Sequence, residues 1–314
     1  MAKTSLEITN LSKKFGRFTA LESISLKVAE GDVYGYIGPN GAGKTTTIRV
    51  LLGILKASEG EAKIFGLDSW KDAVEIHKRI AYVPGDVNLW PNLTGGEVID
   101  LFVSLRGRHD KARREKLIKR FELDPAKKCR TYSKGNRQKV ALVAAFASDA
   151  ELFILDEPTS GLDPLMGHVF NECVMEQKNL GKGVFLSSHI MSEVEQLCDR
   201  VGIIREGRIV EHGTLSEMRH LTRINMSVET EAPIEGLDRI DGVFGVAESL
   251  GRLRFQVDSS AVGAVVAHIS KYGVKKLEST PPTLEDLFMR HYGAGAGIGA
   301  GIGAGAGSAS AKGV

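Results

Sequence analysis

The stretch GPNGAGKTTTIRVLLGIL, residues 38–55, follows a short apolar run, VYGYI, at 33–37. Gly38, Gly41 and Gly43 let the backbone wrap closely around an anion and turn its N–H groups inward. The helix predicted after the loop adds its positive N-terminal end. An apolar strand, a glycine-rich loop with the spacing G-x4-G-K-T and a helix are together typical of a phosphate-binding loop. The stretch therefore predicts a nucleoside triphosphate site in an α/β fold.

Three side chains of this loop suit a nucleotide and its metal ion. Lys44 supplies a compact positive charge for the β- and γ-phosphates, the Thr45 hydroxyl is a ligand for Mg²⁺, and Thr46 suits a further phosphate oxygen. On its own the loop leaves the reaction unspecified. The rest of the predicted cradle is formed by Pro39, Asn40 and Ala42.

The stretch LFILDEP, at 152–158, predicts the second half of the site. Its apolar residues indicate a buried strand, and Asp156 emerges at the carboxyl end, where ligand sites of α/β folds lie. Asp156 is predicted to support the Mg²⁺ ion. Glu157, the next residue, is placed to orient or polarise an attacking water. With the loop upstream, this strand predicts hydrolysis.

Strands alternate with helical segments around these motifs. LEITNLSKKF (6–15) and ALESISLKVA (20–29) predict two antiparallel strands. Further apolar strands are predicted at 80–83, 152–156, 183–188 and 201–205, with helices at 164–179 and 190–198. This alternation predicts a mostly parallel sheet. The segment from about 92 to 150 has helical periodicity and no strand, which predicts an inserted helical subdomain in a first domain covering 1–221.

The chain changes character after residue 221. INMSVET, GVAESL, GRLRFQV and KKLEST favour strands, whereas AVGAVVAHISKY and TLEDLFMRHY favour helices, and Leu250-Gly251-Arg252 suits a hairpin turn. We expect a small α+β domain over 222–292, without a motif of chemistry. The Gly- and Ala-rich segment 293–314 is a poor helix former, which predicts a flexible tail.

Composition excludes several classes of protein. Of 314 residues, 41 are basic and 39 acidic, a net charge of +2 that argues against a dedicated nucleic-acid-binding protein. The stretch 106–130 carries eleven Lys or Arg against four Asp or Glu, which indicates either a solvated helical face or a surface near anionic lipid or an acidic partner loop. Three widely spaced cysteines predict buried thiols rather than a metal site or disulfides. We find no 18-residue apolar segment that predicts a membrane span.

Four further motifs carry a resemblance to a known family. YSKGNRQKVALVAAF (132–146) resembles the signature loop and helix of ATP-binding cassette (ABC) proteins, LSGGQ followed by RQRV, and matches at Ser133 and Gly135. SGLD (160–163) resembles that family's D-loop. His189 resembles its switch histidine, which contacts the γ-phosphate and the attacking water, and Phe15 lies where the family stacks an aromatic ring on adenine. The resemblance covers residues 6–221.

The resemblance implies a fold, a reaction and partners. It implies an ABC nucleotide-binding domain that hydrolyses ATP with Mg²⁺, with Glu157 as catalytic base and His189 beside the γ-phosphate. It also implies a head-to-tail homodimer in which Ser133 and Gly135 complete the partner's ATP site. Separate transmembrane permease subunits are expected to dock on the helical subdomain. This chain would then lie peripherally on the cytoplasmic face of the plasma membrane.

One motif departs from the family pattern. The family's Q-loop usually has the sequence YVPQ, but here it is YVPGD, with Gly85 in the glutamine position and Asp86 after it. Asp86 is either a third metal ligand, through its carboxylate, or part of an ordinary surface turn, which Pro84-Gly85-Asp86 also suits.

The variant motifs YVPGD and YSKGNRQK, together with the C-terminal domain and TLEDLFM at 283–289, resemble those of the daunorubicin- and bacitracin-type export ATPases. The expected function is therefore export of a drug, antibiotic or lipid-like substrate. One alternative is a soluble ABC ATPase that acts on nucleic acid or ribosomes. Such proteins usually have two cassettes, a long coiled coil or zinc-binding cysteines, and this sequence shows none of these features. The other alternative is a small-molecule kinase, which the signature loop argues against.

Overall fold

The computed structural model describes residues 3–105, 110–220, 223–249, 251–280 and 283–285. Several predictions lie wholly or partly outside these residues: the tail at 293–314, most of the helix expected at 283–292, the start of the basic stretch, and position 250 of the predicted hairpin turn and of the strand before it. The division at residues 221 and 222 stays a prediction.

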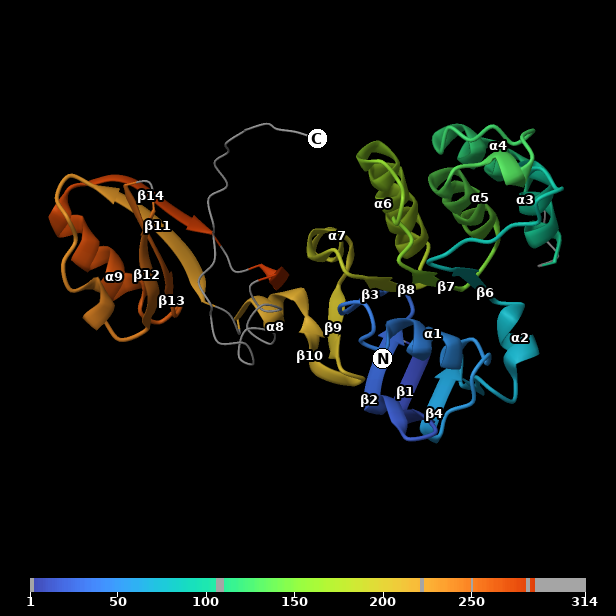
Figure 1. The fold of residues 1–314 in the computed structure, drawn as a ribbon, viewed down its shortest axis with the longest axis horizontal. Coiled ribbons are helices and arrows are strands. Elements are labelled where there is room, and N and C mark those ends of the chain that lie inside the picture. The colour runs from blue at the N-terminus through green and yellow to red at the C-terminus, as the bar shows by residue number, and fades with distance from the viewer. Residues whose placement is uncertain (1–2, 106–109, 221–222, 250, 281–282, 286–314) are drawn as a thin grey trace, which may run out of the picture.

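A six-stranded sheet forms the centre of the first domain (Figure 1). Its strand order is β10-β9-β3-β8-β7-β6, and the five strands from β9 to β6 run parallel, whereas β10 is antiparallel to β9. The strands are β3 (Val33–Ile37), β6 (Ile80–Val83), β7 (Leu152–Asp156), β8 (Gly183–Ser188), β9 (Arg200–Arg205) and β10 (Arg208–Thr214). The predicted mostly parallel sheet is confirmed. Its strands are short apolar runs, which are typical of parallel strands that are buried on both faces.

The two faces of this sheet belong to two hydrophobic clusters. In β7, Phe153 and Leu155 pack into one cluster, and Leu152 and Ile154 into the other. This follows from the two-residue period of a strand. Helices α3, α5 and α6 cover the first face, and α1 with the antiparallel sheet covers the second (Figure 1). Both faces of the sheet are therefore buried, and a ligand can approach the sheet at the carboxyl ends of its strands.

The antiparallel sheet has the order β2-β1-β4-β5. Its strands are β1 (Thr4–Phe15), β2 (Phe18–Ala29), β4 (Glu59–Ile64) and β5 (Leu67–Asp68). β1 and β2 confirm the predicted pair. We did not predict β4, β5 or β10, because their mostly exposed or half-buried residues give a weak apolar pattern.

The segment from about 92 to 150 is helical, as predicted, and contains α3 (Gly95–Ser104), α4 (Lys111–Arg120) and α5 (Lys134–Ala147). Thr94 and Glu97 form a capping box at the start of α3. Two arginines of the basic stretch are neutralised by neighbouring helices. Arg114 pairs with Asp100 at 2.5 Å, and Arg120 contacts carboxylates of α6 (Pro164–Asn179). Both arginine side chains are largely buried, at 13% and 17% exposed, so ion pairs within the chain hold these two residues and neither predicted kind of surface describes them.

The C-terminal part is an α+β unit with its own hydrophobic cluster. Its antiparallel sheet has the order β12-β13-β11-β14, and α9 (Val262–Ile269) packs Val265 and Ile269 into the cluster. The strands are β11 (Ile224–Thr230), β12 (Val243–Ser249), β13 (Arg252–Val257) and β14 (Val274–Thr280). Leu284, beyond β14, is buried in the core of the first domain, and its N–H donates to Glu195 at 2.5 Å.

The other described helices are short or flank the site: α1 (Lys44–Leu51), α2 (Ala73–His77), α7 (Met191–Leu197), α8 (Leu215–His220) and 3-10 turns at Cys129–Thr131, Leu237–Arg239 and Ser270–Tyr272. The three cysteines are free and buried, as predicted. Within the described residues, no helix has both the length and the hydrophobicity required to cross a membrane.

Candidate functional site

The glycine-rich loop connects β3 to α1 at the carboxyl edge of the central sheet. Gly43 has φ +114°, a backbone conformation that side chains rarely adopt, and α1 begins at the next residue. The Lys44 ammonium group donates to the carbonyl oxygens of Gly38 at 2.6 Å and Pro39 at 3.2 Å, so the side chain folds back across the loop. Its charge is therefore held inside the loop before any phosphate binds.

A cavity of about 180 Å³ lies over this loop. It is lined by Phe18, Ala20, Pro39, Asn40, Gly41, Gly43, Lys44, Thr45, Thr46 and Glu157. Seven of the ten belong to the predicted loop, and Glu157 comes from the end of β7. Gly38 and Ala42 belong to the same loop but are not among the lining residues. The structure thus brings the two predicted halves of the site together.

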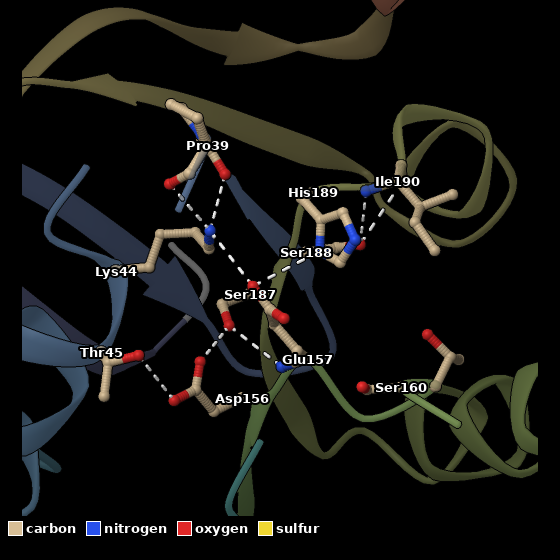
Figure 2. Close-up of polar contacts among 12 residues, drawn as sticks. Pro39, Lys44, Thr45, Asp156, Glu157, Ser160, Ser187, Ser188, His189 and Ile190 are labelled. Atoms are coloured by element: carbon tan, nitrogen blue, oxygen red, sulfur yellow. Dashed lines mark hydrogen bonds and ion pairs between the residues drawn. The ribbon is translucent and has the colours of Figure 1, made fainter. Parts of the chain in front are cut away.

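Thr45 and Asp156 meet below the cavity (Figure 2). The Thr45 hydroxyl donates to Asp156 Oδ2 at 3.0 Å, and the Ser187 hydroxyl donates to Asp156 Oδ1 at 2.5 Å. A hydroxyl and a carboxylate are the hard oxygen donors that Mg²⁺ prefers, so these residues fit the ion. In the described part of the chain no three His, Cys, Asp or Glu side chains gather as a metal site. Any further ligands would come from phosphate, water or the candidate residue Asp86.

Glu157 lies between a lysine and a histidine (Figure 2). Its Oε1 is 3.2 Å from Lys44 Nζ and 3.4 Å from His189 Nδ1. Its backbone has φ +46°, unusual for a residue with a side chain, and its N–H donates to the Ser187 carbonyl and hydroxyl oxygens, both at 3.1 Å. These bonds hold the strained turn, and strain of this kind is concentrated at functional sites.

The YVPGD turn follows β6 and reaches the same edge. A Cβ atom at Gly85 would lie 3.2 Å from the Asp156 carbonyl oxygen, so the turn passes close to the end of β7. Burial, and then the Asp156 carboxylate, raises the pKa of Tyr82 to about 12, which keeps this phenol neutral. Asp86 is exposed and is not among the residues that line the cavity. Its role as a metal ligand stays a proposal.

The signature motif starts α5. The Ser133 hydroxyl caps the helix by accepting from the Asn136 N–H at 3.2 Å, and Ser133 itself is exposed. A Cβ atom at Gly135 would lie 2.4 Å from the Gly161 carbonyl oxygen, so no side chain fits there without a backbone shift. The Lys134 ammonium group donates to the Ser160 hydroxyl at 2.9 Å. The signature and SGLD motifs therefore contact each other, as two parts of one surface.

Neither Ser133 nor Gly135 lines the cavity over the phosphate loop. Both lie at the N-terminal end of the 14-residue helix α5, where backbone N–H groups lack partners within the helix. This end is suited to binding an anion that lies outside the chain's own nucleotide cavity.

Two aromatic rings flank the turn between β1 and β2. Phe15 and Phe18 are paired in the hairpin register, but Phe18 lines the cavity, whereas Phe15 lies under Lys13 Nζ, 4.9 Å from the ring centroid. The sequence reasoning selected Phe15 alone. In the sequence KKFGRF both phenylalanines lie close to the hairpin glycine, so the pattern alone does not distinguish Phe15 from Phe18.

We predicted no role for two residues that hold the site, Ser187 and Gln138, although Gln138 matches the glutamine of the family's RQRV sequence. Ser187 bonds Asp156 and the N–H of Glu157, and the only signal for it is a serine at the end of an apolar strand. Gln138 is fully buried on α5 and donates to the Pro158 carbonyl oxygen at 2.9 Å, which joins the signature helix to the segment after Glu157.

Two family models match the chain. The model described as ABC transporter matches residues 21–160, and the model described as ATP-binding protein DrrA1-3-like, C-terminal domain, matches residues 213–292. The second begins before the boundary that we predicted at 222. The first match includes the phosphate loop, the signature motif and the end of β7, and the second includes the C-terminal α+β unit, whereas Phe15 and His189 lie outside both matches.

Relatives match along nearly the whole chain. An uncharacterised ABC transporter ATP-binding protein, YhaQ of Bacillus subtilis, is 31% identical over 92% of this chain and 99% of its own length. The bacitracin transport ATP-binding protein BcrA of Bacillus licheniformis is 30% identical over 93% of this chain and 98% of its own length.

A solved ATP-binding cassette shares the fold of the first domain. It is a dimer in a post-hydrolysis state with ADP and phosphate bound, and it matches with a TM-score of 0.61 and 25% identity, over 67% of this chain and 98% of that one. The fold and the family expected from the motifs are therefore confirmed. The chain belongs to the ABC transporter family, as an ATP-hydrolysing, ATP-binding protein of the bacitracin and DrrA type.

Proposed function

We propose that this chain hydrolyses ATP at the interface of a head-to-tail homodimer and thereby drives export through separate membrane subunits. The observation that carries the proposal is the cluster of Glu157, Lys44 and His189 at the edge of the phosphate-loop cavity. In it, Glu157 polarises the attacking water, Lys44 binds the β- and γ-phosphates, and His189 contacts the γ-phosphate and the water.

Two copies are needed because the two parts of a nucleotide site, the phosphate-loop cavity and the signature end of α5, do not meet within one chain. The cavity over the phosphate loop contains the lysine and the carboxylate, whereas Ser133 and Gly135 are on the exposed end of α5, outside that cavity. In a head-to-tail dimer the signature end of one chain covers the γ-phosphate bound by the other. The exposed Ser133 and the dimeric structure of a related cassette support this arrangement.

The metal ion would be held by Thr45 and Asp156, with Asp86 as a candidate third ligand. Mg²⁺ supplies charge neutralisation at the β- and γ-phosphates when it is bound. The chain's own contribution is to orient these oxygens: Ser187 bonds one oxygen of Asp156 and leaves the other facing Thr45. Exchange of the Thr45–Asp156 hydrogen bond for metal coordination would then need little movement.

Export of a drug, antibiotic or lipid-like compound is the transport function that the relatives support. BcrA is named for bacitracin transport, and the C-terminal match is to the DrrA type. Membrane subunits would dock on the helical subdomain at 92–150, and the chain would be peripheral on the cytoplasmic face of the plasma membrane. No such observation favours action on nucleic acid, for which the net charge of +2 is also unsuitable.

Copurification tests the transport function. Tagged chain, coexpressed with membrane proteins from neighbouring reading frames, should retain one of them in detergent, and the complex in lipid should show ATPase activity stimulated by a transported compound. A peptide antibiotic and an anthracycline are the first probes. A chain that copurifies with ribosomes or nucleic acid and with no membrane protein would contradict the proposal.

An aromatic residue of the β1–β2 hairpin should stack on adenine, and two matched variants decide which. Phe18 lines the cavity, so we expect Phe18→Ala to weaken binding of a non-hydrolysable ATP analogue about tenfold in titration calorimetry, because stacking on a base is worth about 1–3 kcal/mol. Phe15→Ala, the matched control, should change the Kd less than threefold. A larger effect of Phe15→Ala would instead support the assignment made from the sequence.

A further inference from the structure

Glu193, on α7, bonds two segments that flank the proposed catalytic residues. Its Oε2 accepts from the Thr159 hydroxyl at 2.9 Å and from the Ser188 hydroxyl at 3.3 Å. Thr159 follows Glu157 by two residues, and Ser188 directly precedes His189. One carboxylate oxygen therefore connects the segment after β7 to the end of β8.

The bond to Ser188 also fixes the turn that carries His189. The Ser188 hydroxyl accepts from the Ile190 N–H at 2.9 Å, so a hydrogen bond joins the residue before His189 to the residue after it (Figure 2). The single Ser188 hydroxyl proton has two acceptors in reach, Glu193 Oε2 at 3.3 Å and the Ile190 carbonyl oxygen at 3.5 Å, and the Glu193 oxygen is the nearer and the charged one. The chain of bonds from Ile190 through Ser188 to Glu193 holds the backbone of His189 against α7.

Glu193 is half-buried and does not contact the nucleotide cavity. Burial raises the pKa of its carboxyl group above the usual value and outweighs the opposing effects of the hydrogen bonds from Thr159 and Ser188 and of His189. It is not among the residues that line the cavity over the phosphate loop. Its side chain instead lines a separate groove of about 460 Å³ between α6 and α7. Its position suits a group that acts through its neighbours.

We propose that Glu193 is a positioning residue, which holds His189 and Glu157 at their working separation by bonding Ser188 and Thr159. The inference rests on the proposed roles of His189 and Glu157. Their 3.4 Å contact joins the ends of two strands through side chains alone, and the exposed His189 ring has little packing to fix it. A displacement of about 1 Å at reacting groups can cost about a hundredfold in rate.

The expected kinetic effect is on kcat rather than KM. Glu193→Ala should lower kcat for ATP about tenfold to a hundredfold and leave KM within about twofold, because phosphate binding by the loop is unchanged. Glu193→Gln keeps an oxygen that accepts both hydroxyl hydrogen bonds, so it should recover kcat to within about threefold of the parent. Glu195→Ala is the matched control, since it removes a carboxylate of the same helix, bonded to Leu284 rather than to Thr159 or Ser188.

Two hydroxyl variants test the same bonds without altering Glu193. Thr159→Val is close in shape, and Ser188→Ala removes a single oxygen, so both should fold even if Glu193→Ala does not. Each should lower kcat about threefold to tenfold, with KM unchanged. Full kcat in both variants would overturn the inference.

A double variant separates positioning from a general structural effect. If Glu193 positions His189 and Glu157, Glu193→Ala should lower kcat less in the His189→Ala chain than in the parent chain, because the contact that it maintains with His189 is already lost. Fully multiplied losses would overturn the inference, as would parental kcat in Glu193→Ala while Glu157→Gln and His189→Ala are inactive; the proposed function would then stand. Parental kcat in His189→Ala would instead remove the proposed role of His189, and with it the inference.

Discussion

Replacing Lys44 by alanine should abolish ATP hydrolysis. The ammonium group is 5% exposed, lies within the phosphate loop and is paired with Glu157 at 3.2 Å. No other cationic side chain lines the cavity, among the residues that the structure describes. Loss of a group aimed at developing charge typically costs about a hundredfold to a thousandfold in kcat. Here the substitution also removes the ground-state charge for the β- and γ-phosphates, so ATP binding should weaken too.

The measurement is phosphate release, with nucleotide binding followed separately. Lys182→Ala is a matched control, because Lys182 is also largely buried (15% exposed) and paired with a carboxylate, Asp149 at 3.1 Å. Lys182 precedes β8, at the end of the sheet opposite the site. Lys182→Ala should retain hydrolysis within about twofold of the parent. Normal turnover in Lys44→Ala would show that the loop is not the nucleotide site.

The predictable part of the site follows from parallel strands. Asp156 ends β7 and His189 follows β8, and these two strands are neighbours in the sheet. Carboxyl ends of parallel strands meet at one edge, so residues distant in sequence are brought together by topology. The phosphate loop follows β3, which is also next to β8. A sequence that shows three strand ends with polar residues therefore indicates a site before any contact is known.

The bonds that hold these groups could not be predicted in the same way. Ser187 contacts Asp156 through side-chain geometry, and Glu193 reaches Thr159 across 34 positions in sequence. Serine, threonine and glutamate are common at strand and helix ends, where most of them cap or face water. Only the packing of α7 beside the ends of β7 and β8 gives these residues a shared target. For the same reason the hairpin sequence did not distinguish Phe18 from Phe15.

Strands with few buried residues were also difficult to predict. β10 and β4 have mostly half-buried or exposed residues, so their apolar alternation is weak, although backbone pairing defines both. The buried strands β3, β7 and β8 were recognised because both of their faces are apolar. The strands β3, β7 and β8, whose carboxyl ends carry the predicted site, are interior strands of the central sheet.

Replacing Glu157 by glutamine should trap a dimer with ATP bound. The amide is nearly isosteric with the carboxylate, so the turn at φ +46° and the bonds to Ser187 should persist. The variant lacks the charge that polarises the attacking water, a loss that typically costs about two to four orders of magnitude in rate. It also frees Lys44 from its ion pair, so the lysine remains available for phosphate. ATP should therefore bind without being hydrolysed, and the interface should stay closed.

The expected result is a shift from monomer to dimer in size-exclusion chromatography with light scattering, in the presence of ATP and Mg²⁺. Glu206→Gln is the matched control, because Glu206 also has a positive φ, +49°, but its side chain is 82% exposed, pairs with Arg205 and is not among the residues that line the cavity. It should hydrolyse ATP normally and stay monomeric. Parental hydrolysis in Glu157→Gln would show that Glu157 is not the base.

Adding Ser133→Arg to the Glu157→Gln chain should undo the dimer. Ser133 is exposed at the start of α5, where a bulky side chain would occupy the place of the partner's γ-phosphate without disturbing the chain's own cavity. The double variant should therefore still bind one ATP per chain and remain monomeric. If it dimerises with ATP as the single variant does, the signature end of α5 does not form the interface, and the head-to-tail arrangement is wrong. If Glu157→Gln alone binds ATP and stays monomeric even at high concentration, the nucleotide does not drive dimerisation of the isolated chain, which contradicts the prediction.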